Sequence, residues 1–425
     1  MRITGDGDKL TRRQLLIASG VVGGVGLLAG ATTIGVEELL SRGRTDPAQT
    51  GAKVLVLVTL YGGNDGLNTV IPVHDATYQS QRAGLAYAPA DALVLTDTMA
   101  LNPALKGFKA SWDRKQLAVV QGVGYPKPDR SHFRSMDIWQ TASPDEPVNT
   151  GWIGRWLDAT GDDPLRCVNV GSVLPPLAVG ARSAAAAIGT TGDGSAPTVF
   201  AGAVSGLAKG STQDTTADAL VARACNAELQ IQRTLSPALS APGKPTPSAT
   251  STEQDPQSPA GSGGSQSDLG RQLDVAARCI AAGVPTTVYT VSLGGFDTHA
   301  AEKGTQEAAL GVLDKAVSQF WAALANSPRR DAVVLAVYSE FGRRVQANAS
   351  SGTDHGTAGP VFLVGAPVRG GLYGEPPNLT DLDAGDLKMT TDFRAVYADL
   401  TRHVLDTDPA RVLGRDFPTL GMLSA

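Results

Sequence analysis

Cysteine is scarce in this chain of 425 residues, which contains only Cys167, Cys225 and Cys279. The three are widely spaced and odd in number, so they form no disulfide framework and no metal-binding or redox motif. We therefore interpret them as buried apolar residues.

A basic cluster is also missing. The formal net charge is -5 at pH 7, and Lys and Arg are not gathered in any one stretch of the chain. Because nucleic-acid-binding proteins present clustered cations to the phosphates, this absence argues against nucleic acid as a partner.

An uncharged span rich in Gly and Ala, from Gln14 to Val36, follows Arg12 and Arg13. Paired arginines before a weakly apolar span resemble a twin-arginine export signal. We assign residues 1–36 to this signal, so we expect the twin-arginine translocation machinery as a partner and a periplasmic, cell-envelope or extracellular location. The span is long enough to cross a bilayer, so an uncleaved anchor is the alternative and would be the only membrane contact.

Strand-like and helix-like segments alternate through residues 51–425, which predicts a single α/β domain after a polar linker at 37–50. The composition changes at about 236–270, where Pro, Ser, Gly, Thr and Gln dominate. Such a stretch cannot bury a core, so we predict a disordered insert. A domain boundary is the alternative, but sheet-like segments on both sides favour the insert.

Three apolar segments predict strands buried on both faces of a parallel sheet, and each is followed by a carboxylate. The segments are 54–60, 288–293 and 333–338, and the carboxylates are Asp65, Asp297 and Glu340. In open α/β sheets, ligands bind beyond the carboxyl ends of the strands. We therefore expect these side chains to gather at one rim.

Histidines and a further carboxylate accompany this set. His299 lies two residues after Asp297, and Asp354 and His355 lie in a predicted loop before a strand at 360–364. Carboxylates and imidazoles are the ligands that Zn, Mn and related divalent ions prefer, so the sequence predicts a metal site. For Asp65, an ordinary turn residue is the competing interpretation.

Ser131 opens a predicted helix that follows another buried strand, 117–124. A serine at a helix N-terminus is well placed as a nucleophile, because the helix amides and dipole stabilise a bound anion. The alternative is that Ser131, or Asp129 before it, simply caps the helix.

These motifs together resemble the exported bacterial family called domain of unknown function 1501, a branch of the alkaline phosphatase and sulfatase superfamily. The resemblance rests on five ordered motifs and covers the chain after the signal, except for the insert. They are Tyr61-Gly62-Gly63-Asn64-Asp65-Gly66, Ser131-His132-Phe133, Gly295-Phe296-Asp297-Thr298-His299, Glu340-Phe341-Gly342-Arg343 and Thr353-Asp354-His355-Gly356. It implies an alkaline phosphatase-like α/β fold, with a mainly parallel sheet sandwiched between helices.

The resemblance also implies the roles of individual residues. Ser131, His132 and Arg343 would be the catalytic residues. Ser131 would be the nucleophile, with His132 beside it, and Arg343 would clamp the oxygens of the transferring group; Arg344 and Arg130 are alternatives. The implied metal ligands are Asp65, Asp297, His299, Glu340, Asp354 and His355. Because only His299 and His355 are expected as imidazole ligands, one metal, or a harder ion such as Mn, Mg or Ca, is easier to build than two zinc ions.

The implied activity is metal-dependent hydrolysis of a phosphate or sulfate ester, small or polymeric, using one or two divalent ions. Phe341 after Glu340 departs from the superfamily pattern, in which a histidine follows the later aspartate. The alternative function is an exported binding or scaffold protein that keeps the fold with a degenerate or structural metal site. A further alternative is an envelope protein retained by its signal helix.

Overall fold

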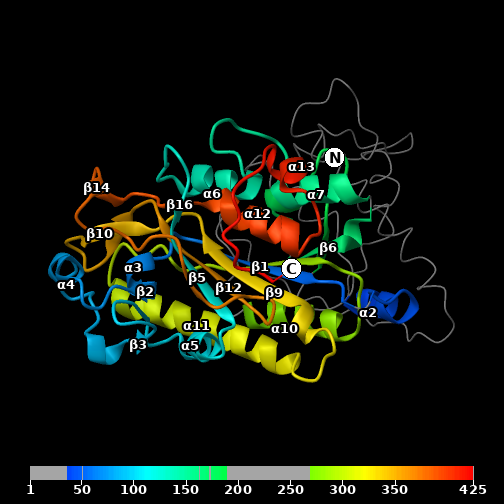
Figure 1. The fold of residues 1–425 in the computed structure, drawn as a ribbon, viewed down its shortest axis with the longest axis horizontal. Coiled ribbons are helices and arrows are strands. Elements are labelled where there is room, and N and C mark those ends of the chain that lie inside the picture. Colours follow the sequence, from blue (N-terminus) through cyan, green and yellow to red (C-terminus); the bar gives the residue numbers. More distant parts are fainter. Residues whose placement is uncertain (1–35, 50, 162, 172–173, 189–268, 425) are drawn as a thin grey trace, which may run out of the picture.

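The computed structural model describes residues 36–49, 51–161, 163–171, 174–188 and 269–424 (Figure 1). The predicted signal at 1–36, except for Val36, and almost all of the predicted insert at 236–270 lie outside these residues. Cys167 and Cys279 are buried, as predicted, whereas Cys225 lies outside the described part of the chain.

A sheet of nine strands runs through the described domain, in the order β13-β5-β12-β9-β1-β8-β6-β7, with β16 paired to β5. All of its pairings are parallel except those of β12 with β5 and β9. The strands are β1 (Val54–Leu60), β5 (Leu117–Gly124), β6 (Cys167–Val170), β7 (Ala186–Ile188), β8 (Val288–Leu293), β9 (Val333–Ser339), β12 (Gly359–Val364), β13 (Gly371–Tyr373) and β16 (Thr391–Asp392). Since β12 alone runs backwards, β1, β5, β8 and β9 all end at the same edge.

Helices cover both faces of this sheet (Figure 1). One face packs on α2 (Val36–Thr45), α5 (Lys106–Asp113), α10 (Leu269–Ala281) and α11 (Glu302–Ala323). The other packs on α6 (His132–Thr141), α7 (Trp152–Thr160), α12 (Phe393–His403) and α13 (Pro409–Leu413). The structure therefore confirms the predicted α/β fold of a mainly parallel sheet between helices.

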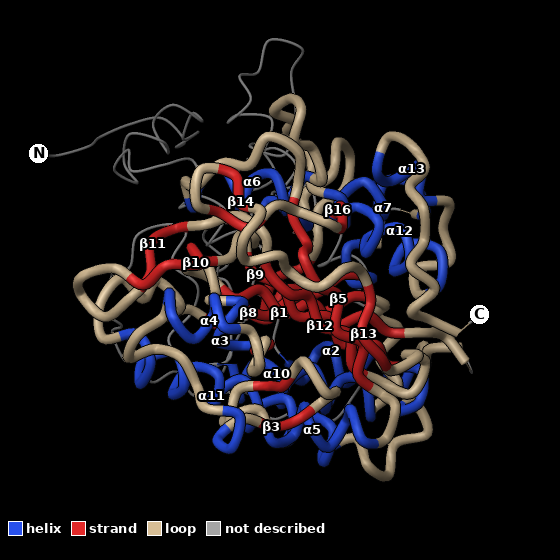
Figure 2. The backbone as a smooth tube through the Cα atoms, turned by 60° about the vertical axis from the view of Figure 1, so that its left-hand side comes forward, coloured by secondary structure: helices blue, strands red, loops and turns tan. Residues whose placement is uncertain are grey.

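Shorter elements lie outside the main sheet (Figure 2). They are the strands β2 (Val70–Ile71), β3 (Leu93–Val94), β4 (Ala100–Leu101), β10 (Arg343–Ala347), β11 (Thr353–His355), β14 (Leu382–Asp383) and β15 (Asp386–Leu387), the helices α3 (Gly66–Thr69) and α4 (Ala76–Gln81), and the 3-10 turns Pro89–Asp91, Pro164–Arg166, Pro176–Ala178 and Arg330–Ala332. The antiparallel pair β10 and β11 holds His355 opposite Arg343.

Two local predictions differ from the structure. The predicted linker 37–50 contains most of α2, because Leu39 is fully buried in the core beside α10. Residues 353–355 form the strand β11 rather than a loop, because their backbone pairs with β10. Among the described residues, no helix is both long and apolar enough to cross a membrane.

Candidate metal centre

Three histidines and one aspartate converge at the edge where the parallel strands end. His132 begins α6 after β5, Asp297 and His299 follow β8, and His355 ends β11. The Nε2 atom of His355 lies 3.1 Å from that of His132 and 2.8 Å from that of His299. The Oδ1 atom of Asp297 lies 3.1 Å from His299 Nε2, 3.2 Å from His355 Nε2 and 3.5 Å from His132 Nε2.

Acceptors on the outer side of the imidazoles orient these rings. His132 Nδ1 lies 2.8 Å from Glu340 Oε1, and His355 Nδ1 lies 2.8 Å from the backbone oxygen of Arg130. Carbonyl and carboxylate oxygens accept hydrogen bonds, so both rings carry a proton on Nδ1. In the neutral form of each ring, Nε2 then carries a lone pair that faces the cluster, the orientation in which histidine binds metals.

The spacing of the inner atoms fits a metal ion. In a tetrahedral site with bonds of about 2.0–2.1 Å, neighbouring ligand atoms lie roughly 3.3 Å apart. The inner atoms of His132, Asp297 and His355 all lie within 4.8 Å of one another. Without a cation, imidazole lone pairs would face each other and a carboxylate. Nitrogen and oxygen donors in this arrangement suit a divalent ion such as Zn.

The surrounding charges set the protonation of the cluster. Burial opposes ionisation of Asp297, but the Arg343 guanidinium and His132 outweigh it and lower its pKa to about 2. Burial lowers the pKa of His355, and Arg343 and His132 add to this effect. For His132, burial works against protonation, but Glu340 and Asp297 overcome it and raise the pKa. Asp297 is therefore anionic at neutral pH.

Solvent reaches this cluster. The side chains are 23% exposed in His355, 30% in His132, 46% in His299 and 51% in Asp297. Structural zinc sites are closed by four protein ligands, whereas catalytic sites keep a position for water or substrate. The accessibility of these ligands leaves room for an exogenous group.

Asp65, a predicted metal ligand, does not lie in this cluster. Its carboxylate is buried and pairs with the fully buried Arg82, whose Nη2 lies 2.9 Å from Asp65 Oδ1. The same carboxylate accepts a hydrogen bond from the Leu67 amide and caps α3. The turn-residue alternative therefore describes its position, because an internal cation already neutralises the carboxylate.

Glu340 and Asp354 lie outside the converging atoms. Glu340 is buried, and its oxygens accept hydrogen bonds from the Gly62 amide and the Ser339 hydroxyl as well as facing His132. Asp354 is exposed, and its Oδ1 lies 3.5 Å from the Nδ1 of His299. Both carboxylates therefore orient histidines, because they contact Nδ1 rather than the inner Nε2.

Arg343 is not free to clamp a substrate. Its buried guanidinium donates to the backbone oxygens of Gly62, Gly63, Phe296 and Thr353. It also donates to Asp297 Oδ1 at 2.7 Å. These bonds tie together the turns after β1 and β8, so Arg343 positions Asp297 instead of facing solvent.

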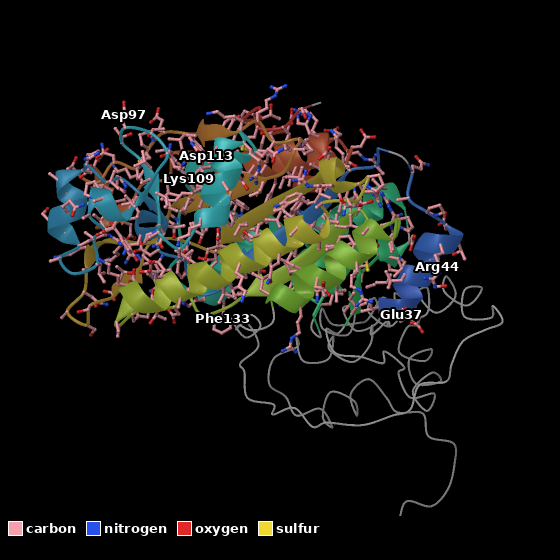
Figure 3. All side chains as sticks on the ribbon, turned by 90° about the horizontal axis from the view of Figure 1, so that it is seen from below. Glu37, Arg44, Asp97, Lys109, Asp113 and Phe133 are labelled. Carbon is pink, nitrogen blue, oxygen red and sulfur yellow. The ribbon has the colours of Figure 1, made fainter. Side chains whose placement is uncertain are left out.

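Ser131 precedes His132 at the N-cap of α6, where its side chain makes no capping hydrogen bond. Ser131 is exposed to solvent. Phe133, two positions later, is 75% exposed and points outward (Figure 3). Ser131 is therefore an exposed, uncapped serine one residue before His132.

His132, predicted as a catalytic residue beside Ser131, directs its Nε2 into the cluster and is a candidate metal ligand that the sequence motifs did not identify. Its imidazole lies between Glu340 on the outer side and His355 on the inner side. The residue follows β5, which ends at the same edge as β8. That position after a parallel strand is the signal in the sequence that marks it as a ligand candidate.

The fold is similar to solved structures of low sequence identity. One is a protein in the alkaline phosphatase superfamily from Vibrio parahaemolyticus, with 11% identity, a TM-score of 0.35, and coverage of 81% of this chain and 72% of that chain. Another is the lipoteichoic acid synthase LtaP from Listeria monocytogenes, with 10% identity, a TM-score of 0.33, and coverage of 84% and 81%. A third is a 2-O GAG sulfatase, with 10% identity, a TM-score of 0.31, and coverage of 86% and 72%.

No curated protein matches the sequence. The model of a family described as protein of unknown function (DUF1501) matches residues 197–419, which is more than half of the chain. This match agrees with the family predicted from the five motifs. The chain belongs to the DUF1501 family.

Proposed function

We propose that this protein is a metal-dependent hydrolase of phosphate or sulfate esters. The observation that carries the proposal is the convergence of His132 Nε2, His355 Nε2 and Asp297 Oδ1 at separations of 3.1–3.5 Å. His299 Nε2 lies 2.8 Å from His355 Nε2 and 3.1 Å from Asp297 Oδ1. His132, His355 and Asp297 would hold a single divalent ion, with His299 beside them. Their exposure supports a site that a substrate can reach.

A divalent ion in this position would lower the pKa of a coordinated hydroxyl and neutralise charge on the transferring group. The chain supplies the other parts. Ser131 presents an uncapped hydroxyl directly before His132, and the N-terminal amides of α6 favour an anion there. Glu340 and the Arg130 backbone oxygen hold two imidazoles with Nε2 directed inward.

Arg130 is better placed than Arg343 to contact the anionic part of an ester. Its side chain is 41% exposed, and Nε and Nη2 bind Asp386, which leaves Nη1 available. Arg344 is directed toward Asp386 and the Ala384 backbone oxygen. Because guanidinium N–H groups match the oxygens of phosphate and sulfate, we assign the clamping role to Arg130.

The test combines metal analysis of protein purified without chelator with initial rates on aryl phosphates and aryl sulfates. Ser131→Ala should lower the rate by about a thousandfold or more while bound metal and fold persist, because the nucleophile is gone. Ser80→Ala, at an exposed position on α4, is the matched control. Equal rates for wild type and Ser131→Ala would exclude the serine as nucleophile. Bound metal without turnover of any ester would favour the exported binding or scaffold protein.

Export by the twin-arginine pathway belongs to the same proposal and is supported by Arg12 and Arg13 before the uncharged span. The machinery recognises the guanidinium pair, so changing both residues to lysine should leave the protein in the cytoplasm. Fractionation of cells that express each form measures this. Unchanged export of the double variant would contradict the assignment.

A further inference from the structure

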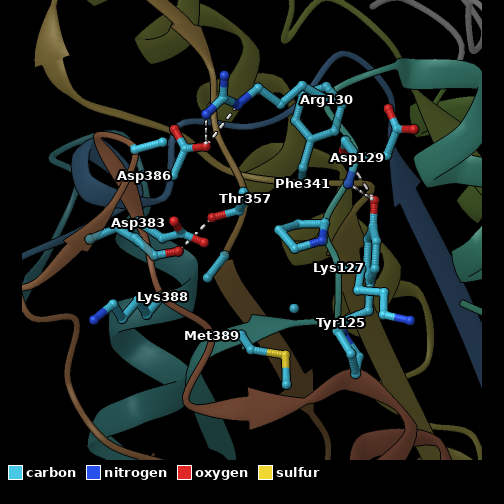
Figure 4. Close-up of a pocket in the computed structure, with 16 residues that line it drawn as sticks. Tyr125, Lys127, Asp129, Arg130, Phe341, Thr357, Asp383, Asp386, Lys388 and Met389 are labelled. Atoms are coloured by element: carbon cyan, nitrogen blue, oxygen red, sulfur yellow. Dashed lines mark hydrogen bonds and ion pairs between the residues drawn. The ribbon is translucent and has the colours of Figure 1, made fainter.

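An open cleft of about 570 Å³ adjoins the metal centre (Figure 4). Phe341 belongs to both: its ring centroid lies 4.8 Å from that of His132 and 5.0 Å from that of His355, and the residue lines the cleft. Arg130 is the second shared residue, because its backbone oxygen binds His355 and its side chain lines the cleft. The cleft therefore lies beside the site and shares two residues with it.

Apolar and charged side chains both line the cleft. The apolar ones include Tyr125, Pro126, Pro128, Phe341, Leu387 and Met389, and the charged ones are Lys127, Asp129, Arg130, Asp383, Asp386 and Lys388. Met389 is 39% exposed, and among the described residues it is one of three large apolar side chains with such exposure, together with Val94 and Phe133. An apolar ligand that binds in a concave site removes such exposed apolar surface from water, which favours binding.

Polar groups on the walls are largely paired within the protein. Arg130 binds Asp386, and the Thr357 hydroxyl donates to the Leu387 backbone oxygen (Figure 4). The Lys388 ammonium pairs with Asp381. Apart from Nη1 of Arg130, these groups already have partners, so they offer few hydrogen bonds to a strongly hydrated alcohol, and the apolar residues between them favour burial of apolar surface.

The absence of a side chain at one wall residue keeps the cleft open. A Cβ on Gly124 would lie 3.0 Å from the Cβ of Met389 and 3.7 Å from that of Ala358. Gly124 ends β5, and α6 begins a few residues later with His132. The same strand therefore leads to the cleft wall and to a metal ligand.

We propose that this cleft binds the organic leaving group of the ester, which makes aryl and alkyl monoesters the preferred substrate class over monoesters of small hydrophilic alcohols. The inference rests on the proposed function. The volume of the cleft lies within the range of about 300–1,000 Å³ that is typical of small-molecule sites. With the leaving group against Met389 and Phe341, the ester group lies toward Arg130 and the histidines.

The kinetic test compares two phosphate monoesters, one with a naphthyl leaving group and one with a methyl leaving group. Met389→Asp places a charge on the apolar wall, so KM for the naphthyl ester should rise about tenfold relative to KM for the methyl ester, the size expected for one lost apolar contact. Val94→Asp changes an exposed apolar residue that does not line the cleft and should leave the ratio unchanged. Equal changes in KM for both esters in Met389→Asp would overturn the proposal.

A binding test separates this inference from the proposed function. Fluorescence titration with naphthol reports on the cleft without turnover or metal. Binding should weaken about tenfold in Met389→Asp, as for one lost apolar contact, and persist in His299→Ala. Naphthol binding that Met389→Asp does not weaken would overturn the cleft assignment even if esters are hydrolysed. If that weakening is observed and no ester is hydrolysed, the cleft stands and the hydrolase proposal fails.

Discussion

Asp65 and Asp297 occupy equivalent places in the sheet and have different surroundings. Each follows a Gly-Gly turn at the end of one of two neighbouring parallel strands, β1 and β8. Asp65 is 1% exposed and paired with Arg82, whereas the Asp297 side chain is 51% exposed and faces three imidazoles. Both carboxylates contact an internal guanidinium, Arg82 for Asp65 and Arg343 for Asp297, so the difference lies in exposure and in the imidazoles that surround Asp297.

In the buried region around Asp65, the charges of the protein neutralise one another. Arg82 donates to both oxygens of Asp65 and to the backbone oxygens of Arg344 and Val345. Burial raises the pKa of Glu302 to about 9, and the Asp65 charge adds to this effect. Glu302 is therefore protonated at neutral pH, so the net charge of the three groups is close to zero. In the exposed region around Asp297, by contrast, the Nε2 atoms of His299 and His355 lie within 3.2 Å of the Asp297 carboxylate.

The largest expected effect comes from breaking the buried pair. Arg82→Met should lower the free energy of unfolding by about 3–5 kcal/mol, because it leaves the Asp65 carboxylate buried without its partner. Lys109→Met is the matched control, since it removes one partner of an exposed pair with Asp113 on α5 (Figure 3). The control should cost about 1 kcal/mol or less. Urea denaturation measures both, and equal losses would contradict the contrast between the regions.

A bound metal ion at the Asp297 cluster should raise the free energy of unfolding, and this gain should not depend on the buried pair of Asp65 and Arg82. An ion at a hundred times its dissociation constant raises the free energy of unfolding by about 2.7 kcal/mol if it binds only the folded state. His299→Ala and Asp297→Ala should each abolish this gain, whereas His74→Ala, at an exposed turn, should retain it. Thermal unfolding with chelator and with added Zn or Mn gives the comparison. A wild-type protein that binds no ion and shows no shift would exclude the metal centre.

The pH dependence of stability should reveal the buried region. The pKa of Glu302 rises from its ordinary 4.5 to about 9 on folding, so the folded state holds a proton that the unfolded state releases. Its contribution is complete below the ordinary pKa and is lost as the pH rises toward 9. Glu302→Gln, which resembles the protonated acid, should flatten this decline. Chemical denaturation between about pH 5 and 9 is the measurement, and parallel profiles for the two proteins would refute the assignment.

The smallest effect concerns the helix caps next to the two regions. Ser131→Ala should cost less than the roughly 1 kcal/mol of a working N-cap, because the Ser131 side chain makes no capping hydrogen bond. Asp75→Ala should cost about that full amount, since Asp75 caps α4 through the amides of Thr77 and Tyr78. Urea denaturation of both variants tests this, and a larger loss for Ser131→Ala would show a structural role for its hydroxyl.

Hydrophobic pattern was enough to predict the main strands and the edge at which the site lies. Apolar runs bounded by glycines identify β1, β8 and β9, and parallel pairing then brings Asp65, Asp297 and Glu340 to one side of the sheet. The five motifs also predicted the family. These features depend on local composition and on the continuous apolar runs that are typical of buried parallel strands.

Only the tertiary structure assigned the individual roles. Arg82 lies 17 residues from Asp65 and Glu302 far beyond it, so no local spacing shows that they neutralise one another. His132 reaches His355 across 223 residues because β5, which precedes His132, pairs with β12, which follows His355. Whether a carboxylate binds a metal depends on the charges within a few ångströms of it, and long-range packing alone brings those charges together.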